Sequence, residues 1–376
     1  MSNTEVFQKG TFGYDALFIK KHFPNTFILS KGNNQVLITP ELQGRVMSST
    51  LNGSNGSSFG WINYDYIESG ERSDQFNPFG GEDYFWVGPE GGQFSVFFKP
   101  GASFDFSNWK VPSAIDTEPF NLVRKTNTEA HFQKEAQFTN HSNNTLRLKI
   151  DRTIRLLDKT KSAELLGITM PKNIQAVGFE SENVITNTGT SEWTKESGMP
   201  SIWILSMLKS KDNIVVTIPF KTGKEDNLGK IVTDDYFGKV PANRLKVSDS
   251  VLYFKADGKK RSKIGLSPKR ALPIMGSFNP DDKILTIAQF TIEENQFDYV
   301  NSLWKIQEHP FEGDAINSYN DGPLENGEQL GPFYELESSS RAADLGPTET
   351  LMHYHRTFHF TGDEQQLKKI TPCLLG

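Results

Sequence analysis

The sequence predicts a mainly β fold, a sandwich or barrel with a few short helices. The chain has 376 residues, of which 12% are aromatic, and Phe alone occurs 28 times. Aromatic residues favour strands, and 31 Gly and 19 Pro divide the apolar runs into short segments. Short apolar runs bounded by turn residues are typical of all-β proteins rather than of helical ones.

Composition also limits the function classes. We expect residues 1–376 to form one domain with a flexible start over residues 1–12, because no repeat, low-complexity tract or linker divides the chain. A net charge of -6 with mixed signs argues against a nucleic-acid binder. No apolar run reaches the length of a transmembrane segment. The oligomeric state stays open.

The compartment stays open as well. The single Cys373 excludes an internal disulfide and a multi-cysteine zinc site. The start, MSNTEVFQKG, contains no signal peptide, so the chain as written is expected in the cytoplasm. A polar start of this kind also follows a removed export signal or a lipid-anchor cysteine. Either would place the protein in the periplasm or at a membrane surface instead.

The expected elements begin with a short helix over residues 14–23, where Asp15 lies near the start and Pro24 follows the end. Alternating runs between turn residues predict strands at 27–30, 35–39, 45–51, 94–99, 120–126, 130–139, 147–157, 163–165, 177–188, 201–208, 213–219, 231–233, 245–247, 251–256 and 284–290. A second helix is expected over residues 293–306, whose apolar positions have helical spacing.

Residues 255–270 hold seven basic side chains around an Asp257-Gly258 turn. We interpret this segment as a solvated hairpin tip, because charge runs near such turns usually face water. An anion or phosphate site is the alternative.

The segment 59–93 combines aromatic rings, carboxylates and glycines outside any clean strand pattern. In sugar-binding clefts, ring faces stack on the ligand while carboxylates accept hydroxyl protons. We therefore predict substrate-binding residues in this segment, namely Glu82, Asp83, Trp86 and Glu90. The alternative is that its aromatic residues only anchor a long loop to the core, as Trp61, Phe85 and Trp86 would.

Residues 333–360 hold two further strand patterns. Because side chains alternate faces along a strand, Glu335 and Glu337 share one face, and His353, His355 and His359 share one face of the second pattern. If the two strands pair as a hairpin, all five titratable groups lie on one surface. We predict catalytic roles for Glu337, Glu335 and His353, and a substrate contact from His355.

A polar loop over residues 315–330 precedes this stretch and is expected to form the rim of the same site. Its Tyr-Asn-Asp triplet supplies three predicted substrate-binding residues, Tyr319, Asn320 and Asp321. Glu325 and Glu328 fit the rim and an exposed loop equally well.

Two segments near the ends of the chain resemble the galactose mutarotase-like superfamily of aldose-epimerase type. Near the start, VLITPELQGRVMSSTLNG is similar to the opening strand, Gly-Arg turn and second strand of that family. Near the end, Leu336-Glu337 and LGPTETLMHYHRTFHF resemble the strand with the general base and the strand that follows. The resemblance implies a β-supersandwich, a substrate-binding role for Arg45 and Glu337 as base, with Glu335 as the alternative.

The resemblance has one gap. The family's acid is a histidine, usually in a His-Gly context, and neither His131 nor His141 has such surroundings. GGEDYFWVGPEGG stands there instead and resembles a Gly-Gly-x-x-x-Trp-x-x-Pro-Glu pattern of other branches. The identity of the acid therefore stays open.

The leading hypothesis is an epimerase-type enzyme acting on a sugar or oligosaccharide. Glu337 or Glu335 would take the anomeric proton, while His353 or a carboxyl group from residues 82–90 protonates the ring oxygen. A glycosidase or lyase on the same scaffold is a second form of this hypothesis. A carbohydrate-binding protein without turnover is the alternative from another class.

A metal site is a third hypothesis, because His353-x-His355 near Glu335 or Glu337 has ligand types suited to zinc, iron or manganese. A His-x-His on a strand is more often a polar or partly buried face, so we expect no metal. No Gly loop of the phosphate-cradling kind occurs between a strand and a helix, and we expect no nucleotide cofactor either.

Overall fold

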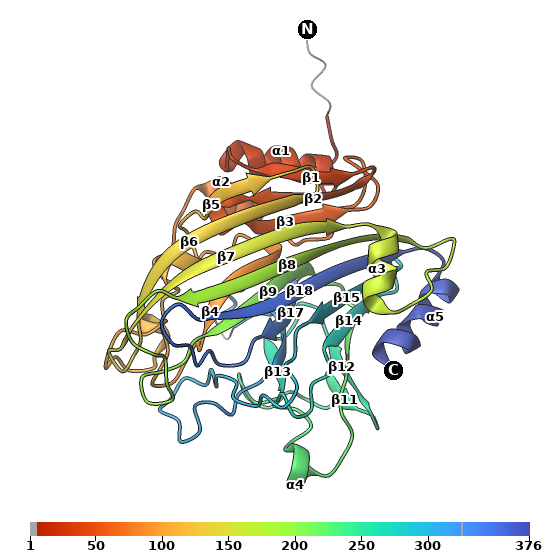
Figure 1. The fold of residues 1–376 in the computed structure, drawn as a ribbon. Helices are drawn as coiled ribbons and strands as arrows, with labels where there is room; N and C mark the ends of the chain where they lie inside the picture. Colours follow the sequence, from red (N-terminus) through yellow and green to blue (C-terminus); the bar gives the residue numbers. More distant parts are fainter. Residues whose placement is uncertain (1–5, 325) are drawn as a thin grey trace.

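The computed structural model describes residues 6–324 and 326–376, which form two antiparallel sheets packed face to face (Figure 1). The mainly β fold class is confirmed. The strands are β1 (Phe27–Lys31), β2 (Asn34–Thr39), β3 (Arg45–Thr50), β4 (Gly81–Gly88), β5 (Asn121–Lys125), β6 (Glu129–Thr139), β7 (Thr145–Leu157), β8 (Gln175–Asn187), β9 (Ser201–Lys209), β10 (Val215–Pro219), β11 (Leu245–Val247), β12 (Val251–Lys255), β13 (Ser262–Leu266), β14 (Ile274–Asn279), β15 (Ile284–Phe290), β16 (Ile316–Asn320), β17 (Phe333–Ser339) and β18 (Thr350–Thr361).

The eight-stranded sheet has the order β1-β2-β3-β4-β9-β17-β16-β13, and the ten-stranded sheet has the order β11-β12-β10-β14-β15-β18-β8-β7-β6-β5. Apolar side chains from both sheets fill the space between them, as Ile204 of β9 and Ile185 of β8 do. This burial is the main favourable term for the fold.

The helices are α1 (Phe12–His22), α2 (Tyr64–Ser69), α3 (Lys159–Leu166), α4 (Glu225–Leu228) and α5 (Glu364–Leu375). Helix α1 confirms the helix predicted at 14–23, and it begins earlier because the Thr11 side chain accepts a hydrogen bond from the Tyr14 backbone N–H. Of the start expected to be flexible, residues 1–5 lie outside the described residues, and Phe12 is fully buried. None of the helices in the described part has the length and apolar character of a membrane crossing.

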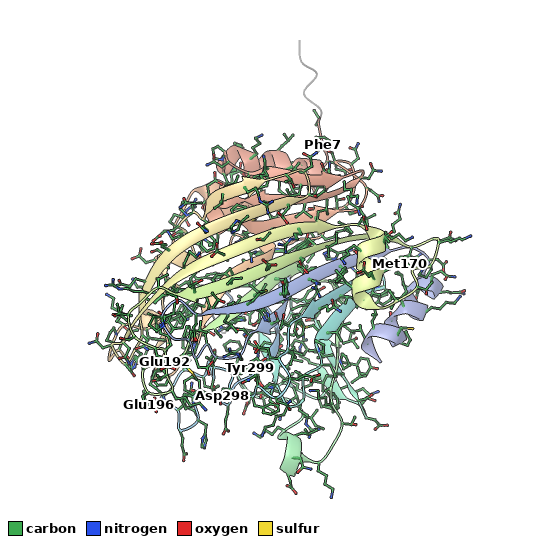
Figure 2. The ribbon with its side chains drawn as sticks, viewed as in Figure 1. Phe7, Met170, Glu192, Glu196, Asp298 and Tyr299 are labelled. Atoms are coloured by element: carbon green, nitrogen blue, oxygen red, sulfur yellow. The ribbon has the colours of Figure 1, made fainter. Side chains whose placement is uncertain are left out.

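Several predicted elements are wrong. The strand expected at 163–165 lies in α3, because Asp158 caps that helix and Gly167 ends it in the left-handed region. The strand expected at 94–99 is irregular, and residues expected in a loop form β4. No helix forms over 293–306, where backbone groups bond to the segment 309–313 instead, as Tyr299 N–H does to the Phe311 carbonyl. Tyr299, labelled in Figure 2, is buried in this loop region.

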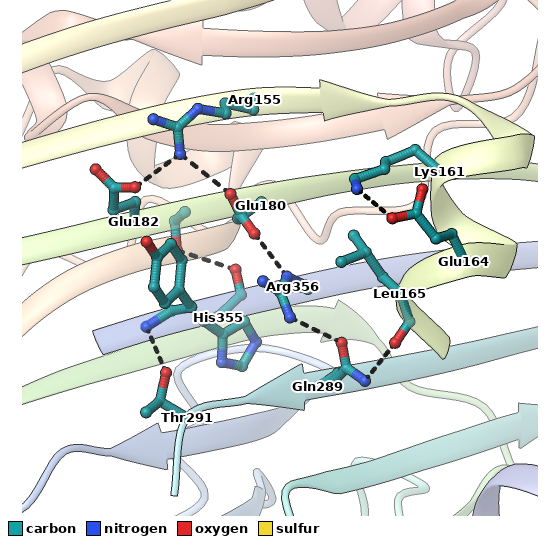
Figure 3. Close-up of polar contacts among 12 residues, drawn as sticks. Arg155, Lys161, Glu164, Leu165, Glu180, Glu182, Gln289, Thr291, His355 and Arg356 are labelled. Atoms are coloured by element: carbon teal, nitrogen blue, oxygen red, sulfur yellow. Dashed lines mark hydrogen bonds and ion pairs between the residues drawn. The ribbon is translucent and has the colours of Figure 1, made fainter. Parts of the chain in front are cut away.

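On the outer face of the ten-stranded sheet, charged and polar side chains stand directly opposite one another on neighbouring strands. Arg155 of β7 stands opposite Glu180 of β8, which stands opposite Arg356 of β18, which stands opposite Gln289 of β15. Figure 3 shows the resulting ladder of contacts, with Arg356 Nε 2.6 Å from Glu180 Oε2. Cross-strand pairs of opposite charge stabilise a particular register. This face is therefore a structural surface, and polar side chains elsewhere supply the candidate site.

The hairpin expected from residues 333–360 is wrong. Strand β17 pairs with β16 and β9, whereas β18 pairs with β15 and β8 in the other sheet. The connection between β17 and β18 thus crosses from one sheet to the other. As a result, the carboxylates and the histidines of this stretch do not share one surface.

Candidate functional site

The candidate site lies on the face of the eight-stranded sheet that points away from the other sheet. Along β17, Ser338 contacts His353 of β18 and Tyr334 contacts Ser277 of β14, so the alternate residues Glu335 and Glu337 point to the opposite side. Neighbouring strands add side chains to the same face, namely Tyr84 and Trp86 from β4, Trp203 from β9, Asn317 and Tyr319 from β16, and Lys263 from β13.

This face forms the floor of a cleft with two lobes. The larger lobe has a volume of about 320 Å³ and includes Asp314 and Trp304 in its lining. The smaller lobe has a volume of about 90 Å³ and includes Glu335 and Trp86. Five residues line both lobes, which makes them parts of one cleft: Glu90, Trp203, Phe237, Arg261 and Lys263. Rings beside carboxyl groups suit a carbohydrate ligand.

Glu337 is fully buried and lines neither lobe itself, but it lies directly beneath the floor, where it contacts two residues that line both lobes. Its Oε2 accepts hydrogen bonds from Lys263 Nζ at 2.9 Å and from the Trp203 indole N–H at 3.0 Å. Burial alone lowers the pKa of Lys263, but the nearby carboxylates of Glu337 and Glu90 raise it above its usual value. Lys263 is therefore a fixed positive charge at the floor of the cleft. Glu337 Oε1 has no hydrogen-bond partner among the described residues.

Glu335 has a different environment. Its Oε1 accepts a hydrogen bond from the Tyr84 hydroxyl at 2.7 Å. Burial and the charge of Glu337 raise the pKa of Glu335 well above its usual range. The Arg45 guanidinium lies 4.6 Å from the centre of the Tyr84 ring. Arg45, predicted to bind substrate, is fully buried behind Tyr84 and lines neither lobe, so it supports the site from behind.

Two more carboxyl groups border the cleft. Burial raises the pKa of Glu90, which the charge of Lys263 opposes. Burial also raises the pKa of Asp314 to about 6, although its Oδ2 accepts a hydrogen bond from the Tyr236 hydroxyl at 2.5 Å. A carboxyl group whose pKa is raised toward neutral pH is better suited to donate a proton than an ordinary carboxyl group.

The structure separates the predicted residues of segment 82–90. Trp86 and Glu90 line the cleft. Glu82 and Asp83 do not, because a bulge between Gly81 and Tyr84 turns this part of β4 toward the other sheet. Glu82 Oε2 there lies 2.8 Å from His359 Nε2, and Asp83 pairs with the fully buried Arg152.

The histidines lie between the sheets rather than in the cleft. Ser338 Oγ is 2.7 Å from His353 Nε2 and 2.8 Å from His355 Nδ1. Burial and the neighbouring imidazole lower the pKa of His353 to about 3, and burial lowers that of His355 to about 4. The expectation that His353 and His355 share a surface with Glu335 and Glu337 is therefore wrong. None of the seven histidines lines either lobe.

The predicted rim is partly at the site. Tyr319 lines the smaller lobe and donates a hydrogen bond to Asp321 Oδ1 at 2.6 Å. Asn320 points to the opposite side of β16, where its side chain bonds the backbone of Gly258 and of Lys260. Glu328 is exposed, and Glu325 lies outside the described residues.

The sequence interpretation did not identify Lys263 as a residue that lines the cleft. Residues 255–270 are not only a solvated tip, because β13 pairs with β16 in the sheet and directs Lys263 into the cleft. The available signal was the alternation in 262–266, where Ser262, Ile264 and Leu266 are buried on the other face. In the described part of the chain, no group of three or more His, Cys, Asp and Glu side chains is arranged to hold a metal ion.

Comparison with solved structures supports the fold. The Slr1438 protein from Synechocystis sp. PCC 6803 aligns with a TM-score of 0.52 at 10% identity over 90% of this chain and 96% of its own. A putative aldose 1-epimerase from Escherichia coli K12 aligns with a TM-score of 0.51 at 9% identity, over 90% of this chain and 99% of its own. A galactose mutarotase-like protein from Lactobacillus casei ATCC 334 aligns with a TM-score of 0.51 at 8% identity, over 89% of this chain and 100% of its own.

The second and third of these structures have the galactose mutarotase-like fold in common with this chain, which confirms the resemblance seen at both ends of the sequence. Identities this low establish the fold alone. No curated protein matches the sequence. A family model described as "Family of unknown function (DUF6786)" matches residues 10–376. The chain therefore belongs to the DUF6786 family, a divergent branch with the galactose mutarotase-like fold.

Proposed function

We propose that the chain binds a carbohydrate in this cleft and interconverts the anomers of a free sugar by carboxylate acid–base chemistry. The observation that carries the proposal is the different surroundings of two carboxyl groups on one strand face. Glu337 contacts an ammonium and an indole N–H, which both stabilise a carboxylate. Glu335, beside it, has a raised pKa and accepts a hydrogen bond from Tyr84.

Such a pair can move protons in opposite directions. Glu337 would accept the proton of the anomeric hydroxyl, while Glu335 or Glu90 gives a proton to the ring oxygen. The bond between the anomeric carbon and the ring oxygen then breaks, which yields the open-chain aldehyde. Rotation about the adjacent carbon–carbon bond and the reverse proton transfers close the ring as the other anomer, so both carboxyl groups regain their starting states.

The test is saturation-transfer NMR of anomer exchange on a panel of aldoses with the wild type and the Glu337→Gln, Glu335→Gln and Glu90→Gln variants. Glu328→Gln is the control, because Glu328 is an exposed acid of the loop near the cleft. We expect the wild type to accelerate exchange, Glu337→Gln to lose about 10²-fold or more of that rate, and the control to keep it. Equal rates in all variants would exclude these carboxyl groups from the reaction.

A second candidate is a carbohydrate-binding protein without turnover. The observation that favours it is that no histidine lines the cleft, whereas the resemblance implies a histidine acid. The same NMR samples separate the two functions. Line broadening of sugar signals without faster exchange would support binding alone, and absence of both effects for every sugar would exclude both functions for that panel.

A further inference from the structure

Arg261 stands at the junction of the two lobes and lines both. Its guanidinium carbon lies 3.9 Å from the centre of the Phe237 ring. The Phe237 ring in turn packs edge-on against Tyr319, with centroids 6.0 Å apart. Phe237 is 45% exposed, so this stack lies at the mouth of the cleft. The stack fixes the plane of the guanidinium without using any of its N–H groups.

The polar atoms of Arg261 have no protein partner among the described residues. The side chain makes no hydrogen bond and no ion pair there, whereas Lys263, two residues along, pairs with Glu337. A guanidinium carries five N–H donors in a planar fork that matches carboxylate, phosphate and sulfate oxygens. A half-buried arginine of this kind at the mouth of a cleft is arranged to contact a ligand.

The acidic groups around the cleft offset this charge only in part, because none of them forms an ion pair with Arg261 among the described residues. Lys263 offsets Glu337 by direct contact. Burial raises the pKa of Glu335, of Glu90 and of Asp314, which disfavours the negatively charged form of each carboxyl group. Because Arg261 lines both lobes without a direct partner among the described residues, its positive charge is available to an anion that enters the mouth.

We propose that the ligand of this cleft is an acidic carbohydrate, whose carboxylate, phosphate or sulfate group binds the Arg261 guanidinium while its ring lies over Trp203 and the carboxyl groups of the floor. The inference rests on the proposed carbohydrate function and adds the substrate class. It also recovers the anion site that the basic segment 255–270 left open as an alternative.

The test is an NMR titration of the full chain with matched sugars at one ionic strength. The probes are D-glucose, D-glucuronic acid and D-glucose 6-phosphate, with the corresponding galactose series. Wild type is compared with Arg261→Met, with Arg261→Lys, which keeps the charge but not the fork, and with Lys260→Met. Lys260 is an exposed neighbour outside the cleft lining and serves as the matched control.

We expect at least one acidic sugar to bind wild type and Lys260→Met about tenfold or more tightly than its neutral parent. Arg261→Met should lose that preference while it keeps the affinity for the neutral parent, and Arg261→Lys should fall between. Preference for the uronate over the phosphate, or the reverse, identifies the anionic group. Thermal unfolding of each variant checks that it is folded.

Neutral sugars that bind as tightly as acidic ones would overturn the acidic-ligand inference and leave the proposed carbohydrate function standing. If Arg261→Met still prefers acidic sugars to neutral ones, the acidic-ligand inference is likewise overturned and the proposed carbohydrate function stands. If no sugar of either kind binds the wild type, the proposed function and this inference both fail.

Discussion

Lys263 Nζ lies 2.9 Å from Glu337 Oε2 across a sequence separation of 74 residues. The two side chains are only 11% and 0% exposed. Breaking a buried ion pair by removal of one partner leaves an uncompensated charge. We therefore expect Lys263→Met to lower the free energy of unfolding by about 3 kcal/mol. Urea unfolding measures this loss.

The double variant Lys263→Met with Glu337→Gln supplies the control, because it removes both charges. Its loss should be smaller than the sum of the two single losses, since the residues are coupled. Additive losses would mean that the pair contributes nothing to stability beyond its separate members.

Asp314 should make stability fall as pH rises. Its pKa is about 6 in the folded protein against 3.8 for the ordinary side chain. Between these values the folded state binds more protons than the unfolded state, so the free energy of unfolding declines with rising pH. Asp314→Asn retains an acceptor for Tyr236 and should be more stable than the wild type at pH 7, with the difference shrinking toward pH 4. Urea unfolding across that range measures it, with Asp249→Asn, a variant of an exposed aspartate that does not contribute to the Asp314 shift, as control. A difference that is constant with pH would contradict the raised pKa.

The histidines between the sheets should act in the opposite direction. The pKa values of His353, about 3, and of His355, about 4, lie below the ordinary 6.5 of a histidine side chain. The unfolded state therefore binds more protons below about pH 6.5, and stability falls as pH falls through this window. We expect His355→Gln to reduce this acid slope, and the exposed His309→Gln to leave it unchanged. Equal slopes in wild type and His355→Gln would show that His355 titrates normally.

Ser338 contacts both imidazoles, and one hydroxyl proton cannot serve two ring nitrogens. At least one imidazole N–H must therefore donate to Ser338 Oγ. Ser338→Ala should cost about 1–3 kcal/mol of unfolding free energy, because it leaves buried ring nitrogens without a partner. Because the side chain faces away from the cleft, sugar binding by the folded variant should not change. Altered sugar binding would mean that the space between the sheets communicates with the cleft.

The sequence predicted which side chains share one face of a strand much better than it predicted which strands pair with one another. Alternation correctly placed Glu335 and Glu337 on one face of a strand, because that period is a local property of the backbone. It did not reveal that β17 pairs with β9 and β16, since strand order depends on segments more than a hundred residues away, as in the contact of Trp203 with Glu337. Lys263 was missed for the same reason. A lysine in a basic run appears solvated until the sheet partner and the carboxylate that bury it are known.

Asp83 shows how a residue predicted for the site can be essential to the fold instead. The Asp83 carboxylate contacts Arg152, and Asp83 Oδ2 accepts a hydrogen bond from the Ser181 hydroxyl at 2.7 Å. Arg152 also donates a hydrogen bond to Asn183 Oδ1 at 2.6 Å. All of these side chains are fully buried between the sheets. Asp83→Ala should therefore cost about 3–5 kcal/mol, because it leaves the Arg152 charge without its carboxylate. The fraction that remains folded should bind sugars as the wild type does, because Asp83 lines neither lobe. Chemical unfolding beside a sugar titration checks both parts. A stable Asp83→Ala protein that has lost sugar binding would return Asp83 to the site.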